Sequence, residues 1–143
     1  MLEIEYGHRL ISCSSEENFM NKKNAAKIIR ERTHPTIFDF AYLTTRAHLK
    51  TFWMFRNNLV KQANPVSILD LGCGQKPFQS LLKGLKIERY VGVDFDSGRS
   101  VPDIVGPIDE LPLDDDSFDA IIATEVFEHT LHLEKAITEM KRV

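Results

Sequence analysis

The sequence of 143 residues predicts an α/β fold in which a helical N-terminal segment precedes an open, mainly parallel sheet. Apolar residues first recur at helical spacing, and from Val66 onward short aliphatic runs alternate with turns and a short helical stretch. A sharp glycine turn, Leu71-Gly72-Cys73-Gly74, directly follows the first aliphatic run. We therefore expect a helical part, residues 1–64, and an α/β part, residues 65–143, divided at Asn64-Pro65.

The helical part is expected to begin with one amphipathic helix. Residues 1–13 are ambiguous between a short strand and an extended arm. A helix is predicted from Glu16 to Glu31, because Ser14 or Ser15 can serve as its N-cap and acidic residues occupy its first turn. The helix should end before Pro35.

A second helix is predicted to begin at Pro35 and to reach about Gln62. We expect its aromatic-rich stripe to pack against the sheet, and a wall of a substrate pocket is the alternative. His48 lies in this helix with no partner evident from the sequence and is interpreted as structural or exposed. The stripe consists of Ile37, Phe38, Ala41, Tyr42, Leu49, Phe52, Trp53 and Leu59.

The α/β part is predicted to hold four strands, at residues 66–70, 89–94, 103–106 and 118–124. Pro77 suits the first position of a short helix that continues to Lys83, and Gly84 can cap its end. The last predicted helix runs from Leu131 to Val143, with one apolar face formed by Leu133, Ile137 and Met140.

Charge and composition exclude several classes of function. Residues 1–62 hold ten Lys and Arg against six Asp and Glu, whereas residues 63–143 hold eight against fifteen. We interpret this as a basic helical segment that covers an acidic domain, and a basic face for an anionic substrate is the alternative. Nucleic-acid binding is not favoured, because no basic cluster is interleaved with aromatic residues. Two cysteines, Cys13 and Cys73, indicate a cytosolic protein, and no apolar run approaches the ~18 residues of a membrane span.

Strand ends carry the candidate site, because ligands bind outside the carboxyl ends of open parallel sheets. Gly72 and Gly74 allow the backbone to approach a ligand closely. Asp94 follows Gly74 by twenty residues, at the end of the second strand, where a carboxylate can bind the two hydroxyls of a ribose. Together with Asp70, which precedes the turn, these residues predict a nucleoside site.

A dinucleotide-binding oxidoreductase is the alternative class of protein for a chain with this glycine turn. Its fingerprint would require a third glycine where this chain has Pro77. A carboxylate such as Asp70 beside the turn suits a cationic amine better than a pyrophosphate. The residues therefore favour a nucleoside that carries an amino-acid tail, and the sequence shows no constellation of metal ligands.

The chain resembles the class I S-adenosylmethionine-dependent methyltransferases, and most of all their type 11 small-molecule members. The matching runs are ILDLGCGQKPF, YVGVDFD, DIVGPIDELPLDDDSFDAIIATEVFEH and the start of the helix that follows, and the resemblance covers about residues 66–143. The resemblance implies a Rossmann-like sheet of seven strands in the order 3-2-1-4-5-7-6. Four strands, in the order 3-2-1-4, are readable here, and strands 5 to 7 are not. The fourth strand would then be an edge, and either a fragment or a homodimer through that edge is expected.

The resemblance also implies roles for the residues around the glycine turn. Asp70 and the backbone of Gly72, Cys73 and Gly74 would hold the methionine part of S-adenosylmethionine. Thr124 and Glu125, after the fourth strand, would line the same side. Lys76 stands where many members have a small residue, although a subgroup with a KP turn shares it.

On the adenosine side, Asp94 would bind the ribose, Phe95 would pack on the adenine and Ile108 would touch its edge. Pro107 stands where the family usually has an acidic residue for the adenine amino group, so backbone groups or Asp109 would take that part.

The function expected from the resemblance is methyl transfer to a small-molecule or glycan-like acceptor. His129, in a Glu-His pair after the fourth strand, is the candidate general base. The alternative is that His129 has a purely structural role in the loop. Residues 1–64 would form a cap on the substrate side. A non-catalytic fragment that binds the nucleoside or offers an interaction surface is the alternative function.

Overall fold

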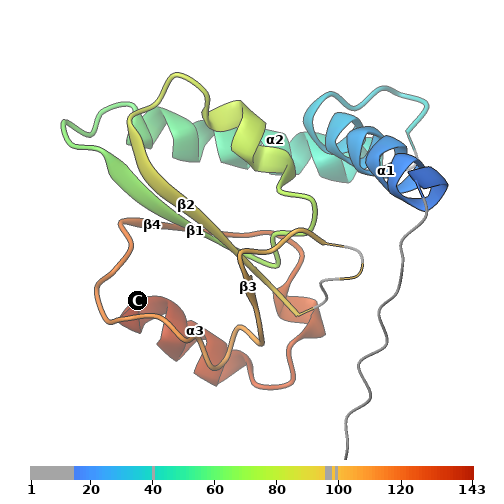
Figure 1. Ribbon diagram of the computed structural model, residues 1–143. Helices are drawn as coiled ribbons and strands as arrows, with labels where there is room; N and C mark the ends of the chain where they lie inside the picture. The colour runs from blue at the N-terminus through green and yellow to red at the C-terminus, as the bar shows by residue number, and fades with distance from the viewer. Residues whose placement is uncertain (1–14, 40, 96–97, 99) are drawn as a thin grey trace, which may run out of the picture.

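The computed structural model describes residues 15–39, 41–95, 98 and 100–143. The predictions for residues 1–13, and for Ser14 as an N-cap, lie outside this part. Figure 1 shows a sheet with α1 and α2 on one side and α3 on the other. In chain order the elements are α1 (Ser15–Thr33), α2 (Tyr42–Leu59), β1 (Val66–Leu71), η1 (Pro77–Leu82), β2 (Ile87–Asp94), β3 (Ile104–Val105), β4 (Ala120–Ala123), η2 (Phe127–His129) and α3 (Leu133–Arg142).

The sheet has the predicted order. Its four strands lie in the order β3-β2-β1-β4, and every neighbouring pair is parallel. β2 begins two residues earlier than predicted, whereas β3 and β4 are shorter than predicted. β4 lies at the edge of the described sheet, as expected, and the homodimer through this edge remains a prediction.

β1 is the centre of the fold, since all of its residues are buried between two layers. Its side chains alternate between the faces, so Ile68 belongs to one core and Leu69 to the other. The core on the α2 side also holds Phe52, Phe78 and Leu82, and the rings of Phe52 and Phe78 stack with centroids 5.0 Å apart. This arrangement fixes the carboxyl end of β1, where the candidate site begins.

The prediction that Pro35 opens the second helix is wrong. Residues 34–39 form a turn, and α2 begins at Tyr42. The carboxylate of Asp39 accepts hydrogen bonds from the N–H and hydroxyl of Thr36, at 2.6 and 3.0 Å, and from Arg30 at 2.9 Å. These bonds stabilise the turn in place of a first helical turn.

The predicted apolar stripe is therefore correct in part. Phe52 is buried, and Leu49 and Leu59 pack against it. Ile37 and Phe38 lie in the turn and are 72% and 92% exposed, because no helix carries them to the sheet.

The last predicted helix is present as α3 and begins two residues later than predicted. Ala136 is buried and Met140 packs on the core, whereas Leu133 and Ile137 are 45% and 40% exposed. Hydrogen bonds join α3 to the loop before β4: Glu139 accepts from the N–H of Leu111 at 2.8 Å. Arg142 donates to the carbonyls of Leu111 and Leu113 at 3.0 and 2.7 Å. In the described part of the chain, no helix is long and apolar enough to cross a bilayer.

Candidate functional site

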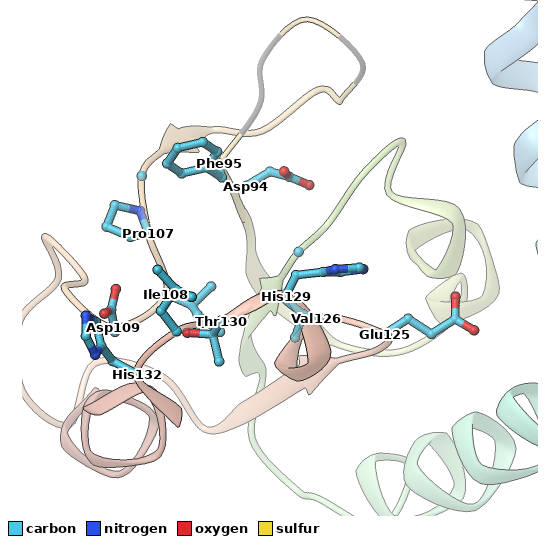
Figure 2. A pocket seen from close by; sticks show the side chains of 13 residues that line it. Asp94, Phe95, Pro107, Ile108, Asp109, Glu125, Val126, His129, Thr130 and His132 are labelled. Atoms are coloured by element: carbon cyan, nitrogen blue, oxygen red, sulfur yellow. The ribbon is translucent and has the colours of Figure 1, made fainter. Parts of the chain in front are cut away.

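Two adjoining cavities lie at the carboxyl ends of β1, β2 and β4. The larger has a volume of about 440 Å³ and the smaller about 240 Å³. Gly72, Glu125 and His129 line both of them. Figure 2 shows the larger cavity, with Asp94 and Phe95 on one side and Val126 and His129 on the other. The strand-end site predicted from the sequence is therefore a real depression in the surface.

The glycine turn forms the boundary between the cavities. Gly72 and Gly74 have φ values of +65° and +51°, which favour glycine. A Cβ at Gly72 would lie 2.7 Å from Cγ2 of Val126, so a side chain there would collide with the loop after β4. A Cβ at Gly74 would meet no atom within 4 Å. The turn thus leaves open space beside its backbone.

Asp94 connects this turn to the end of β2 by a hydrogen bond. One oxygen of its carboxylate accepts the N–H of Gly74 at 2.8 Å. The N–H groups of Gly72 and Cys73 both donate to the carbonyl of Val93, at 2.9 and 3.1 Å. The turn and the carboxylate predicted to bind ribose are consequently held together.

Asp70 is a buried carboxylic acid at the end of β1, where it lines the smaller cavity and is 3% exposed. Burial raises its pKa to about 6, while the hydroxyl of Tyr90, which donates to it, and the charge of Lys76 act in the opposite direction. A cation in the smaller cavity would favour the charged carboxylate. Cys73 is buried, and burial raises the pKa of its thiol to about 12, so the thiol is neutral at physiological pH.

The far wall of the larger cavity comes from the segment after β3. Ile108 is buried there and Pro107 is exposed, and both line the cavity together with Asp109. Phe95, after β2, is 79% exposed on the opposite side. The cavity therefore has an apolar floor and an exposed aromatic ring at its rim.

The segment after β4 carries Thr124, Glu125 and His129. Thr124 lines the smaller cavity, and His129, in η2, is exposed between the two cavities. Glu125 has a left-handed backbone with φ of +53°, unusual for a residue other than glycine. In Figure 2 its side chain points away from the larger cavity.

Glu125 lies close to side chains of both N-terminal helices, a proximity that the sequence did not reveal. Arg32 of α1 lies 2.7 Å from its Oε2, and His48 Nδ1 of α2 lies 3.7 Å from its Oε1. Arg32 and Ile28 of α1 also line the smaller cavity. The one available signal for Arg32 was the basic charge of the N-terminal half.

The fold is a parallel α/β domain with two cavities at its strand ends, the place where domains of this class bind ligands. Residues 69–143 match the model of the methyltransferase domain family of type 11. The chain therefore belongs to this family of S-adenosylmethionine-dependent methyltransferases, which use that cofactor as the methyl donor. No curated protein sequence matches the chain.

Solved structures show the same fold. The YcgJ protein of Bacillus subtilis has 23% identity and a TM-score of 0.56, over 67% of this chain and 46% of its own. The PH0226 protein of Pyrococcus horikoshii has 25% identity and a TM-score of 0.58, over 84% and 60%. A SAM-dependent methyltransferase from Aquifex aeolicus has 21% identity and a TM-score of 0.51, over 87% and 65%. The chain spans less than two thirds of each of these proteins.

The buried state of Asp70 predicts a stability effect. Its pKa in the folded protein, about 6, lies above the ordinary value of 3.8, so folding favours the protonated acid. The associated stability is complete below pH 4 and is lost as the pH rises through 6. Asp70→Asn should therefore stabilise the cofactor-free protein by about 1–3 kcal/mol at pH 8 and by much less at pH 4.

Urea unfolding at both pH values measures this difference. Asp114→Asn, a change in an exposed turn, is the control and should have the same small effect at each pH. An equal effect of Asp70→Asn at pH 4 and pH 8 would contradict the assignment.

Proposed function

We propose that this domain binds S-adenosylmethionine across the two cavities and transfers its methyl group to a small-molecule or glycan-like acceptor. One observation supports this most: Asp70, one residue before the end of β1, and Asp94, at the end of β2, flank a glycine turn that borders open space at Gly74. A buried acid on one side and an acid beside an apolar cavity on the other suit a ligand with an amine, a ribose and a flat base.

The residues present fit this cofactor. Asp70 and the backbone of Gly72, Cys73 and Gly74 would hold the amino-acid end, because the buried acid favours a cation nearby. Thr124 and Glu125 would border the same end. Asp94 would bind the ribose hydroxyls.

Phe95 and Ile108 face the larger cavity from opposite sides and would enclose the adenine between them. Pro107 offers no side-chain acceptor, so Asp109, which lines the same cavity, is proposed to bind the adenine amino group.

When bound, the cofactor supplies a methyl group on a sulfonium that needs no further activation. The protein must orient the acceptor in line with that methyl and exclude water. His129 borders both cavities, so its imidazole can take a proton from an acceptor hydroxyl or amine. We assign it the role of general base.

We also propose that residues 1–64 form a cap on the substrate side. Arg32 and Ile28 already contribute to the smaller cavity, and the Arg32–Glu125 pair ties α1 to the loop after β4. A cytosolic location, inferred from the cysteine content, remains a prediction. A fragment that binds the nucleoside without turnover is the alternative. It would bind S-adenosylhomocysteine but transfer no methyl group to any acceptor.

The 143-residue chain should bind S-adenosylhomocysteine in calorimetry. Asp94→Ala should weaken this binding by at least about tenfold, because it removes a charged hydrogen-bond acceptor from the ribose. Asp114→Ala is the matched control and should bind like the unmodified chain. Absence of binding to the folded protein, or tighter binding of a dinucleotide, would contradict the proposal.

Removal of the Arg32 side chain should loosen the loop after β4. In Arg32→Ala, hydrogen exchange of amides in residues 124–131 should accelerate about fivefold, while global stability changes by less than about 1 kcal/mol, since the pair is partly exposed. Arg46→Ala, on the exposed side of α2, should leave this exchange unchanged. Unaltered exchange in Arg32→Ala would show that the Arg32–Glu125 pair does not hold the loop after β4 in place.

His129→Ala should lower kcat by about 10²–10⁴-fold with a hydroxyl or amine acceptor, if the imidazole accepts the proton. The affinity for S-adenosylhomocysteine should change little. Full turnover in His129→Ala would make His129 a structural residue. Binding of S-adenosylhomocysteine with no turnover in a screen of acceptors would favour the non-catalytic alternative.

A further inference from the structure

Lys76 is a charged residue in the glycine turn that the proposed function does not use. It has a left-handed backbone, with φ of 52° and ψ of 49°, immediately before Pro77 opens η1. Its side chain is mostly buried, at 14% exposure. A buried lysine needs a charged or polar partner for its ammonium, and a strained backbone persists only where surrounding contacts hold it.

The partner is Asp103, just before β3. Lys76 Nζ lies 2.7 Å from Oδ2 of Asp103. The same oxygen accepts the N–H of Gly92 at 2.7 Å, and the N–H of Asp103 donates to the carbonyl of Gly92 at 2.8 Å. Asp103 thus binds both backbone groups of one residue of β2 and the ammonium of the turn.

Gly92 shows that the side chains of the turn lie directly on β2. A Cβ at Gly92 would be 2.6 Å from Cε of Lys76 and 2.7 Å from Sγ of Cys73. The aliphatic part of Lys76 therefore occupies the space where a side chain of β2 would stand. Two residues further along β2 is Asp94, which binds Gly74.

Gly92 is the register partner of Asp70 in the pairing of β1 and β2, so the Lys76 side chain that lies on Gly92 is also next to this buried acid. The charge of Lys76 lowers the pKa of that buried acid, against the effect of burial. Tyr90 and Asp94 of β2 are the other groups with a direct influence on it. Further ionisable groups face the smaller cavity: Arg32, Glu125, Glu128 and His129.

We propose that Lys76 is a positioning residue of the cofactor site, which links the glycine turn to β2 and β3 through Asp103 and places a positive charge beside Asp70, the acid proposed to bind a cationic amine. The part that concerns the amine rests on the proposed function. The anchoring and the charge are properties of the free protein and are tested separately.

The test follows the carboxyl-carbon NMR signal of Asp70 from pH 4 to pH 9 in the cofactor-free chain. In Lys76→Met the titration midpoint should rise by about half a unit or more, because a nearby positive charge is removed. Lys76→Arg keeps the charge and should titrate like the unmodified chain. Lys86→Met, an exposed lysine before β2, is the matched control and should also leave the midpoint in place.

Asp103→Asn provides an independent test that retains the lysine. It removes the anchor but frees the ammonium from its negative partner, so the midpoint of Asp70 should stay or fall. Both Lys76→Met and Asp103→Asn should bind S-adenosylhomocysteine more weakly at pH 7, by about threefold or more. If the two substitutions only damaged the turn, the titration midpoint of Asp70 would move in the same direction in Lys76→Met and in Asp103→Asn.

An unchanged midpoint in folded Lys76→Met, or a raised midpoint in Asp103→Asn, would overturn the inference. Absence of S-adenosylhomocysteine binding by the unmodified chain would contradict the proposed function, whereas the NMR titration would still decide the role of Lys76 toward Asp70.

Discussion

The complete burial of β1 is the constraint on which the rest of this structure depends. All six residues of the strand are buried, and its neighbours β2 and β4 shield it on both edges. Burial of Ile68 and Leu69 in opposite cores holds the layers together, but it also places Asp70 in a region of low polarity. The free-energy cost of burying that carboxylate in its charged form is reduced by the hydrogen bond from Tyr90 and by the charge of Lys76. A bound cation would reduce this cost further.

Two of the three non-glycine residues with positive φ in the described part of the chain lie beside the same site; the third is Asp116, in the turn before β4. Lys76 and Glu125 both have left-handed backbones although neither is glycine, and each flanks a cavity wall. Each is also held by a charged partner, Asp103 for Lys76 and Arg32 for Glu125. Strained residues persist where surrounding contacts overdetermine them, which is common at functional sites. Each of the two ion pairs therefore holds a segment that borders the smaller cavity.

Much of the fold was predictable because it depends on local patterns. The aliphatic run at residues 66–70, the glycine turn and the position of Asp94 specify β1, the turn and the end of β2 without reference to distant residues. The order of the four strands came from the resemblance and was confirmed. The neighbourhood of Asp94 and the glycine turn was also expected, since both were assigned to strand ends.

What was missed depends on contacts between residues far apart in the sequence. The turn before α2 is stabilised by the bonds of Asp39, and α3 is joined to residues 111–113 by the bonds of Glu139 and Arg142. The Arg32–Glu125 pair joins residues more than ninety positions apart. No periodicity encodes such contacts, because they require the packed helices and the sheet to be in place first.

The central claim is that Asp70, the glycine turn and Asp94 together hold one nucleoside cofactor. A crystal structure of the chain with S-adenosylhomocysteine tests it most directly. We expect the amine beside Asp70, the ribose hydroxyls on Asp94 and the adenine between Phe95 and Ile108. A ligand bound elsewhere, or one with its amino-acid end in the larger cavity, would contradict it.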